Sequence, residues 1–92
     1  MTESFAAALV DNNGGLISQH HVTKCDHISK GLYMITYDSS FTALPGVQAT
    51  CWGAGYLLGL NVLAQNCCEV IVQDTQGNAV DNGFSFFAPG TI

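Results

Sequence analysis

The sequence predicts an all-β fold, a single antiparallel β-sandwich or barrel of about seven short strands. Two observations support this prediction. Short segments alternate between apolar and polar residues, and turn-forming residues separate them at intervals of about eight to twelve positions. No linker, low-complexity segment or internal repeat is visible, so residues 1–92 are expected to form one β-sandwich domain.

The N-terminal elements are expected on either side of a glycine-rich turn. Residues 4–10 (SFAAALV) could begin a helix by propensity, but the segment is short and Asp11–Gly15 (DNNGG) follows at once. Because Asn and Gly tolerate positive φ, these residues predict a tight turn between two strands. Residues 16–22 (LISQHHV) alternate as a strand does, and residues 23–27 either continue that strand or bend away from it. A turn is expected over residues 26–30.

The most informative segment runs from Gly31 to Thr50 (GLYMITYDSSFTALPGVQAT). Side chains alternate across a strand, so residues 32–37 divide into two sets that face opposite ways. The two sets are Tyr33, Ile35 and Tyr37, and Leu32, Met34 and Thr36. A short polar turn is expected next, and Pro45-Gly46 predicts a corner before a second strand at residues 47–50.

The C-terminal half begins with an ambiguous stretch and then becomes regular. Residues 51–59 contain three glycines, which fits either a bulged strand or a loop over the end of the barrel. Residues 67–75 (CCEVIVQDT) are typical of a strand, and residues 74–78 predict a hairpin turn. Residues 83–88 (GFSFFA) are expected to close the sheet.

The surface must carry little charge. Charged residues make up 10% of the chain, against about 25% in an ordinary soluble domain. Lys24 and Lys30 are the only basic residues besides histidine, and the net charge is −5. Because the core of a subunit interface is depleted of charge, this composition predicts a homo-oligomer that hides much of its surface.

The same composition excludes several partners. Nucleic acids and anionic membrane surfaces require clustered Lys or Arg, so neither is expected. The longest apolar run, residues 56–64, is too short to cross a bilayer, and no membrane insertion is expected. The N-terminus has no positively charged segment that would indicate a secretory signal. Localisation is left open, with a virion or a released extracellular particle among the settings that fit.

The four cysteines are expected to be reduced and buried. They are Cys25, Cys51, Cys67 and Cys68. Neighbouring residues of a strand point to opposite faces, so vicinal cysteines cannot share a partner, and free cysteine behaves as a small buried hydrophobe. The alternative is a single disulfide, either Cys25–Cys67 or Cys51–Cys68.

Metal binding and catalysis are not expected. The cluster His20-His21-x-x-x-Cys25-x-His27 offers ligands that zinc prefers, but same-face positions along a strand lie about 6.6–6.8 Å apart, too far to share a metal without a bend. The Cys25/His27 and Ser18/His20 pairs are not followed by residues that would build a nucleophile elbow or an oxyanion hole. We therefore predict a non-enzymatic protein without a cofactor, a bound metal or catalytic residues.

The aromatic residues suggest where a ligand would bind. Phe84 and Phe86 are expected in the core, with Phe87 turned outward or into an interface. Trp52 and Tyr56 flank two glycines, and Asn61 follows within one strand length. Sugars stack on such rings while amides bind their hydroxyls, so Trp52, Tyr56 and Asn61 are the predicted ligand-binding residues. The competing interpretation is that Trp52 packs against a neighbouring subunit or in the core.

Several motifs resemble those of known β-sandwich domains. The recurring strand cores and final hairpin of small domains at the tips of phage-type tail fibres are similar to three motifs here, Gly31-x-Tyr33-x-Ile35-x-Tyr37, Val47-x-Ala49-Thr50 and Asp74-x-x-Gly77-x-x-x-Asp81-x-x-Phe84. The Phe41-x-x-x-Pro45-x-Val47 step also resembles H-type lectin domains, which are trimeric six-stranded sandwiches that bind sugars. The resemblance spans Asp11 to Phe87 and implies a trimer with a glycan- or surface-binding role.

Two functions follow as predictions. The first is a non-enzymatic, trimer-forming structural or receptor-binding domain of a fibre-like assembly. The alternative is a small lectin-like carbohydrate-binding module. The partners expected are further copies of the chain and a glycan or cell-surface receptor.

Overall fold

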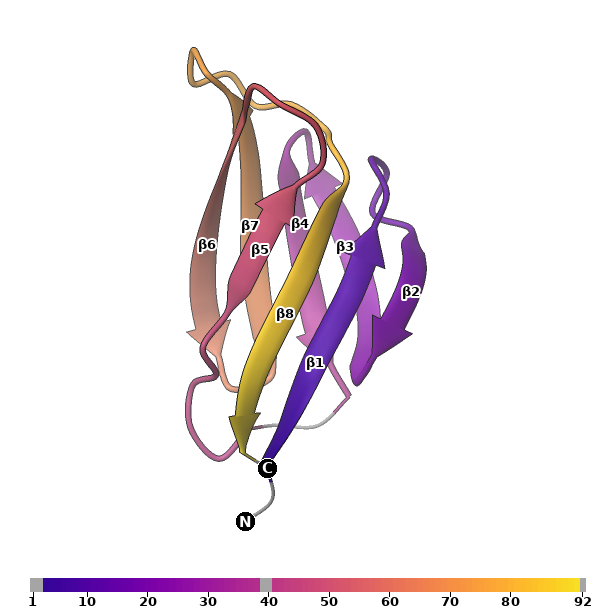
Figure 1. The fold of residues 1–92 in the computed structure, drawn as a ribbon, viewed down its shortest axis with the longest axis vertical. Helices are drawn as coiled ribbons and strands as arrows, with labels where there is room; N and C mark the ends of the chain where they lie inside the picture. The colour runs from indigo at the N-terminus through magenta and orange to yellow at the C-terminus, as the bar shows by residue number, and fades with distance from the viewer. Residues whose placement is uncertain (1–2, 39–40, 92) are drawn as a thin grey trace.

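The protein is all β in the computed structural model, which describes residues 3–38 and 41–91 and contains no helix in these ranges (Figure 1). Eight strands form two antiparallel sheets of four strands each. The strands are β1 (Glu3–Val10), β2 (Leu16–His20), β3 (Val22–Ser29), β4 (Leu32–Tyr37), β5 (Gln48–Cys51), β6 (Tyr56–Ala64), β7 (Cys67–Asp74) and β8 (Phe84–Thr91). The predicted all-β sandwich is confirmed, with eight strands in place of about seven.

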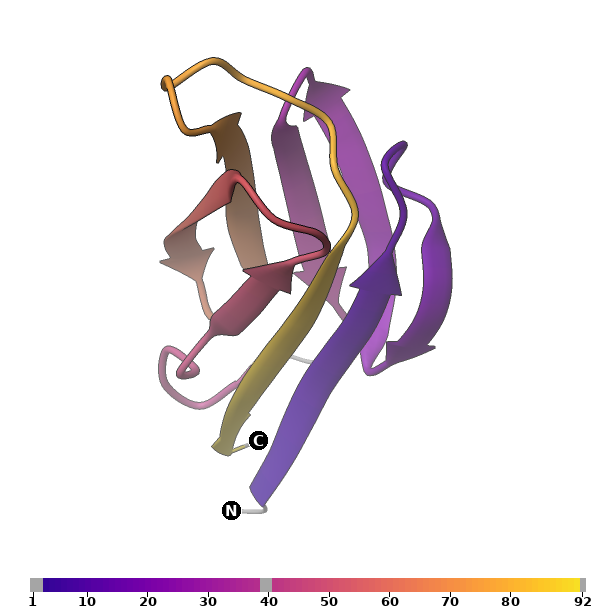
Figure 2. The ribbon, with the colours of Figure 1, turned by 45° about the horizontal axis from the view of Figure 1, so that its top comes forward.

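The two sheets lie face to face. Sheet A has the strand order β2-β1-β8-β5 and sheet B the order β3-β4-β7-β6. In Figure 1 sheet A lies in front with β1 and β8 at its centre, and Figure 2 shows the two layers separately. The β2–β3 connection joins the sheets on one side of the sandwich and the β5–β6 connection joins them on the other. The molecule is elongated, with extents of 42 × 21 × 21 Å.

Residues from the four central strands fill the core. Each contributes three side chains in alternation, and the sets are Ala6, Ala8 and Val10; Tyr33, Ile35 and Tyr37; Cys68, Val70 and Val72; and Phe84, Phe86 and Ala88. The predicted division of residues 32–37 is therefore confirmed. The rings of Tyr33 and Tyr37 face Phe84 and Phe86 of sheet A, with centroids 5.2 and 6.2 Å apart, so aromatic side chains of both sheets meet between the layers.

Two turns have the same Asp-x-x-Gly construction. At Asp11 and at Asp74, one carboxylate oxygen accepts the amides two and four residues on, at 2.8–3.0 Å. The glycine that follows three residues later, Gly14 or Gly77, has a φ of +85°. Both predicted turns are present, because Asp supplies the acceptors and Gly the left-handed backbone. The first is a β1–β2 hairpin, whereas the chain after the second crosses to sheet A.

The additional strand arises where the sequence was ambiguous. His21 has a φ of +56°, which breaks the chain between β2 and β3, so residues 23–27 belong to a strand of the other sheet. The turn expected over residues 26–30 is wrong in extent, since β3 continues to Ser29 and only Lys30 and Gly31 turn. Gly31 has a φ of +73°, and a Cβ there would lie 2.5 Å from the carbonyl oxygen of Val72. Glycine at this position therefore allows both the left-handed backbone of the short turn and the close approach to β7.

The ambiguous stretch at residues 51–59 holds both a loop and strands. Cys51 ends β5, residues 52–55 form a loop, and β6 begins at Tyr56. The last strand is longer than expected and reaches Thr91, where it pairs with Glu3. The polar turn predicted after Tyr37 includes residues 39–40, which lie outside the described residues.

Candidate functional site

Trp52 packs over the outer face of sheet A, just beyond the end of β5. Its indole Nε1 donates a hydrogen bond to Ser85 Oγ, and its backbone amide donates to the carbonyl of Gly83, both at 3.0 Å. A Cβ at Gly83 would lie 2.5 Å from the six-membered part of the indole, so the ring rests directly on this glycine. The residue is still 38% exposed. Trp52 therefore has a fixed position and a ring that another molecule could contact.

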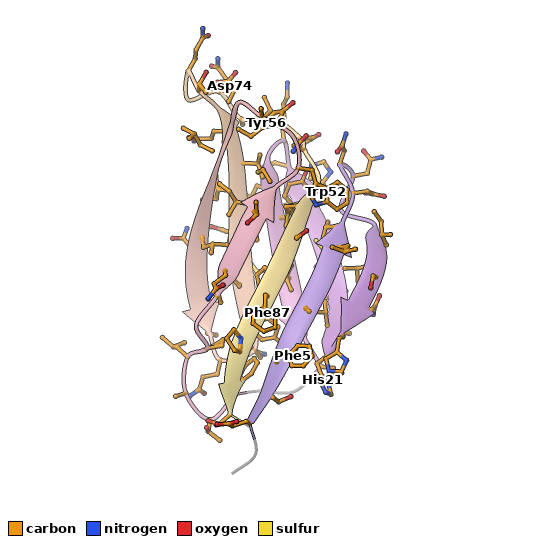
Figure 3. The ribbon with its side chains drawn as sticks, viewed as in Figure 1. Phe5, His21, Trp52, Tyr56, Asp74 and Phe87 are labelled. Carbon is orange, nitrogen blue, oxygen red and sulfur yellow. The ribbon has the colours of Figure 1, made fainter. Side chains whose placement is uncertain are left out.

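The three predicted ligand-binding residues lie on two different parts of the molecule. Tyr56 is exposed and lies toward the same end as Trp52, where the β5–β6 and β7–β8 loops are found (Figure 3). Asn61 lies about 16 Å further along β6, five residues on in an extended strand. Its side-chain amide donates to Glu69 Oε1 at 3.0 Å on the outer face of sheet B. The structure brings Trp52 and Tyr56 to one end and does not bring Asn61 to them.

A hydrogen-bond network holds the loop end of the sandwich together. Asn12 accepts the hydroxyl proton of Tyr33 on its carbonyl at 2.7 Å and the amide of Gly83 on its side chain at 2.8 Å. Asp81 Oδ1 accepts the amide of Gly31 at 2.7 Å and lies 2.8 Å from His27 Nε2. The Gly31 amide, with His27 beside it, holds the pKa of Asp81 below its ordinary value. These contacts tie the loops to both sheets.

The fold keeps the rings of His20 and His21 in contact, with centroids 4.3 Å apart, and places His27 against Tyr33 and Asp81. His21 lies at the opposite end from the loop network, with its Nδ1 3.1 Å from Asp38 Oδ1 (Figure 3). His20 stacks on Phe5 with ring centroids 4.4 Å apart, and His27 stacks on Tyr33 at 4.7 Å. Across residues 3–38 and 41–91, no three His, Cys, Asp or Glu side chains converge as a metal site requires.

All four cysteines are free thiols, but only Cys68 is buried, and Cys25, Cys51 and Cys67 are half-buried, so the prediction of four buried thiols is wrong for these three. Burial raises the pKa of Cys25 and of Cys68 from 9.0 to about 11, and it raises that of Cys51 as well. The thiolate is the nucleophilic form of cysteine, so these thiols are poor nucleophiles near neutral pH. On β3, Cys25 packs against the core, and His27 Nε2 lies 2.8 Å from Asp81 Oδ1.

The outer face of sheet A carries a stripe of aromatic side chains across three strands. Phe5 on β1 lies between His20 on β2 and Phe87 on β8, with a Phe5–Phe87 centroid distance of 5.4 Å. Phe5 and Phe87 are 40% and 41% exposed (Figure 3). A shallow hollow of about 570 Å³ adjoins the two rings, and its lining includes Pro89 and Thr91. The prediction that Phe87 points away from the core is confirmed.

Sequence reasoning gave no role to Phe5 and Leu9, which lie on this face. Both belong to β1, which contains the apolar run FAAALV without alternation in polarity. A strand whose two faces are both covered by protein typically has a continuous run of apolar residues without alternation. That uninterrupted run was the available signal for a strand with two apolar faces.

The comparisons with known proteins give no relative. No protein-family model matches the chain, and neither a curated protein nor a solved structure does. No helix in the described part of the chain is long and apolar enough to cross a bilayer.

Proposed function

We propose that the chain is a non-enzymatic, homotrimer-forming structural or receptor-binding domain of a fibre-like assembly. One observation carries the proposal: large hydrophobic side chains remain exposed over a molecule that has very few charges. Those exposed by more than a third are Phe5, Leu9, Ile17, Ile28, Leu44, Trp52, Tyr56, Leu57 and Phe87. An isolated domain of 92 residues with 10% charged residues would be poorly solvated with this surface, whereas an assembly covers part of it.

The trimer and the fibre-like setting rest on the resemblance of the strand motifs to tail-fibre tip domains. The elongated sandwich agrees with such a role, because a long β-rich body places its loop end far from its opposite end. The chemistry of the described side chains also favours binding or structure over catalysis, since burial raises the pKa of Cys25 and Cys68 and keeps both thiols protonated near neutral pH.

Light scattering after size exclusion tests this proposal. The expected particle has three times the 9.7 kDa mass of the chain at micromolar concentration. An obligate interface should survive dilution to that level. A particle with the mass of one chain would overturn the proposal, and a dimer or tetramer would correct the number of copies.

The alternative is a lectin-like module, and one observation favours it. Trp52 and Tyr56 lie toward the same end, and the positions at Gly53 and Gly55 leave space beside the tyrosine, with nothing within 4 Å of a Cβ at Gly55. A glycan could stack on either ring there. A glycan array with the wild-type protein and the Tyr56→Ala variant tests this function. Leu57→Ala serves as the control, because Leu57 is the next exposed residue of β6 and points to the other face.

Specific glycan signals that disappear in Tyr56→Ala and persist in Leu57→Ala would support the lectin function. An array without signal for the wild-type protein would eliminate it and leave the structural role.

A further inference from the structure

We infer that the outer face of sheet A is the surface through which the chain binds a second copy of itself. The residues at the centre of this face are Phe5, Leu9, His20, Ser85 and Phe87, with Trp52 at its loop end. This inference rests on the proposed homotrimer and adds to it the identity of the interface, since three copies can turn this face toward one threefold axis so that each contacts its neighbours through it.

The first argument is the distribution of side chains on β1. Its inward residues include two alanines, Ala6 and Ala8, whereas its outward residues include the larger Phe5 and Leu9. A half-exposed strand of an antiparallel sheet normally places its larger apolar side chains inward and polar ones outward. The outward side of β1 is therefore built for contact with protein.

The second argument is charge. Copies of a chain with a net charge of −5 repel each other, so they can meet only where carboxylates are few. The outer face of sheet A has one charged residue in its strands, Glu3 at the end of β1, among the residues described. The outer face of sheet B, by contrast, carries Lys24, Asp26 and Glu69. Sheet A is the face that a like-charged copy can approach.

The third argument is shape and area. The face combines two exposed rings, Phe5 and Phe87, with an adjoining hollow of about 570 Å³ that these rings line together with Pro89 and Glu3, so its surface is uneven. β1 and β8 are about 26 Å long, whereas β2 and β5 are about half that length, so four strands about 4.8 Å apart give a flat area of about 400 Å². A pair of copies would bury about 800 Å² before the projecting side chains are counted, below the roughly 1,200–2,000 Å² of a standard interface and in the range of weaker association.

Charge-introducing variants test which face is the interface. Phe87→Glu and Leu9→Glu each place a carboxylate on the outer face of sheet A, and both side chains already point outward, so the fold should survive. Leu57→Glu is the matched control, because Leu57 is 54% exposed on the outer face of sheet B and receives the same charge. Circular dichroism establishes that each variant is folded, and sedimentation equilibrium gives its mass.

We expect the wild-type protein and Leu57→Glu to be oligomers of the same mass. Phe87→Glu and Leu9→Glu should dissociate, with a dissociation constant raised by about 30-fold or more, the effect of losing an interface hot spot. The single tryptophan gives a second readout, since emission from Trp52 should shift to longer wavelength when the wild-type oligomer is diluted until it dissociates.

The outcomes distinguish the two proposals. A monomeric wild-type protein would overturn both the assembly function and this interface. A wild-type oligomer that survives Phe87→Glu and Leu9→Glu, or one that Leu57→Glu dissociates equally well, would overturn the interface and leave the assembly function standing. If Phe87→Glu does not fold, Leu9→Glu alone decides between these outcomes.

Discussion

At the residue scale, two buried tyrosines of β4 differ in one hydrogen bond. The hydroxyl of Tyr33 donates to the carbonyl of Asn12 at 2.7 Å, whereas the buried hydroxyl of Tyr37 finds no partner among the described residues. Both rings face the core from the same strand, so they provide an internal comparison. An unpartnered buried hydroxyl costs free energy that a phenylalanine would not incur.

The first prediction compares the same substitution at these two positions. Tyr33→Phe should lower the free energy of unfolding by about 0.5–1.5 kcal/mol, the net value of one hydrogen bond. Tyr37→Phe should leave it unchanged or raise it, because the new side chain fills nearly the same volume without a polar group. Urea unfolding at matched protein concentration measures both. Equal losses in the two variants would contradict the prediction.

At the element scale, the turns anchor the strands through carboxylates whose pKa values are lowered. Amides of Asn78 and Gln76 lower the pKa of Asp74, and the amide of Gly31, with His27, lowers that of Asp81. A carboxyl group with a lower pKa in the folded state stabilises the fold above its unfolded pKa. That stabilisation is lost as the pH falls through the folded pKa.

The second prediction follows from this linkage. The melting temperature of the wild-type protein should be nearly constant from neutral pH to about pH 5 and should fall in more acidic solution. Asp81→Asn should melt lower at pH 7 and lose less on acidification, because its group no longer titrates. Asp26→Asn is the control, since Asp26 is exposed and pairs with Lys24 at the surface. An acid transition in Asp81→Asn as steep as that of the wild type would count against the prediction.

The strands and turns also show which parts of the fold could be predicted from the sequence and which could not. Alternation located β4, and the Asp-x-x-Gly turns were predictable because their geometry depends on the residues that form them. β1 was not predictable from alternation, because both of its faces are apolar. Local sequence also could not show that His21 breaks the chain between two sheets, since a positive φ is uncommon for a residue other than glycine.

At the scale of the whole molecule, the sequence also could not predict which candidate ligand-binding residues lie together. Trp52, Tyr56 and Asn61 are close together in the sequence. Because β6 is an extended strand of nine residues, Tyr56 and Asn61 lie far apart along it and on different faces of the sandwich. Trp52 depends on Gly83 and Ser85, which are distant in sequence and become neighbours through the β5–β8 pairing. Residues that are close along a chain form one site only when a turn or an adjacent strand returns them to the same surface.

The third prediction concerns the thiols, which lie in and around the core. Because burial raises the pKa of Cys25 and Cys68 to about 11, the folded protein keeps protons that the unfolded chain loses above pH 9.0. Their contribution to stability is therefore complete below pH 9.0 and is lost as the pH rises toward about 11. Thermal unfolding from pH 7 to pH 11 should show this alkaline loss of stability. A Cys25→Ala/Cys68→Ala variant should show a shallower loss from a lower starting melting temperature.

Titration with a thiol reagent at pH 8 should find all four cysteines in denaturant, with Cys25 and Cys68 protected in the native protein. Rapid native labelling of Cys68, whose side chain is fully buried, would show that the core opens far more readily than its packing indicates.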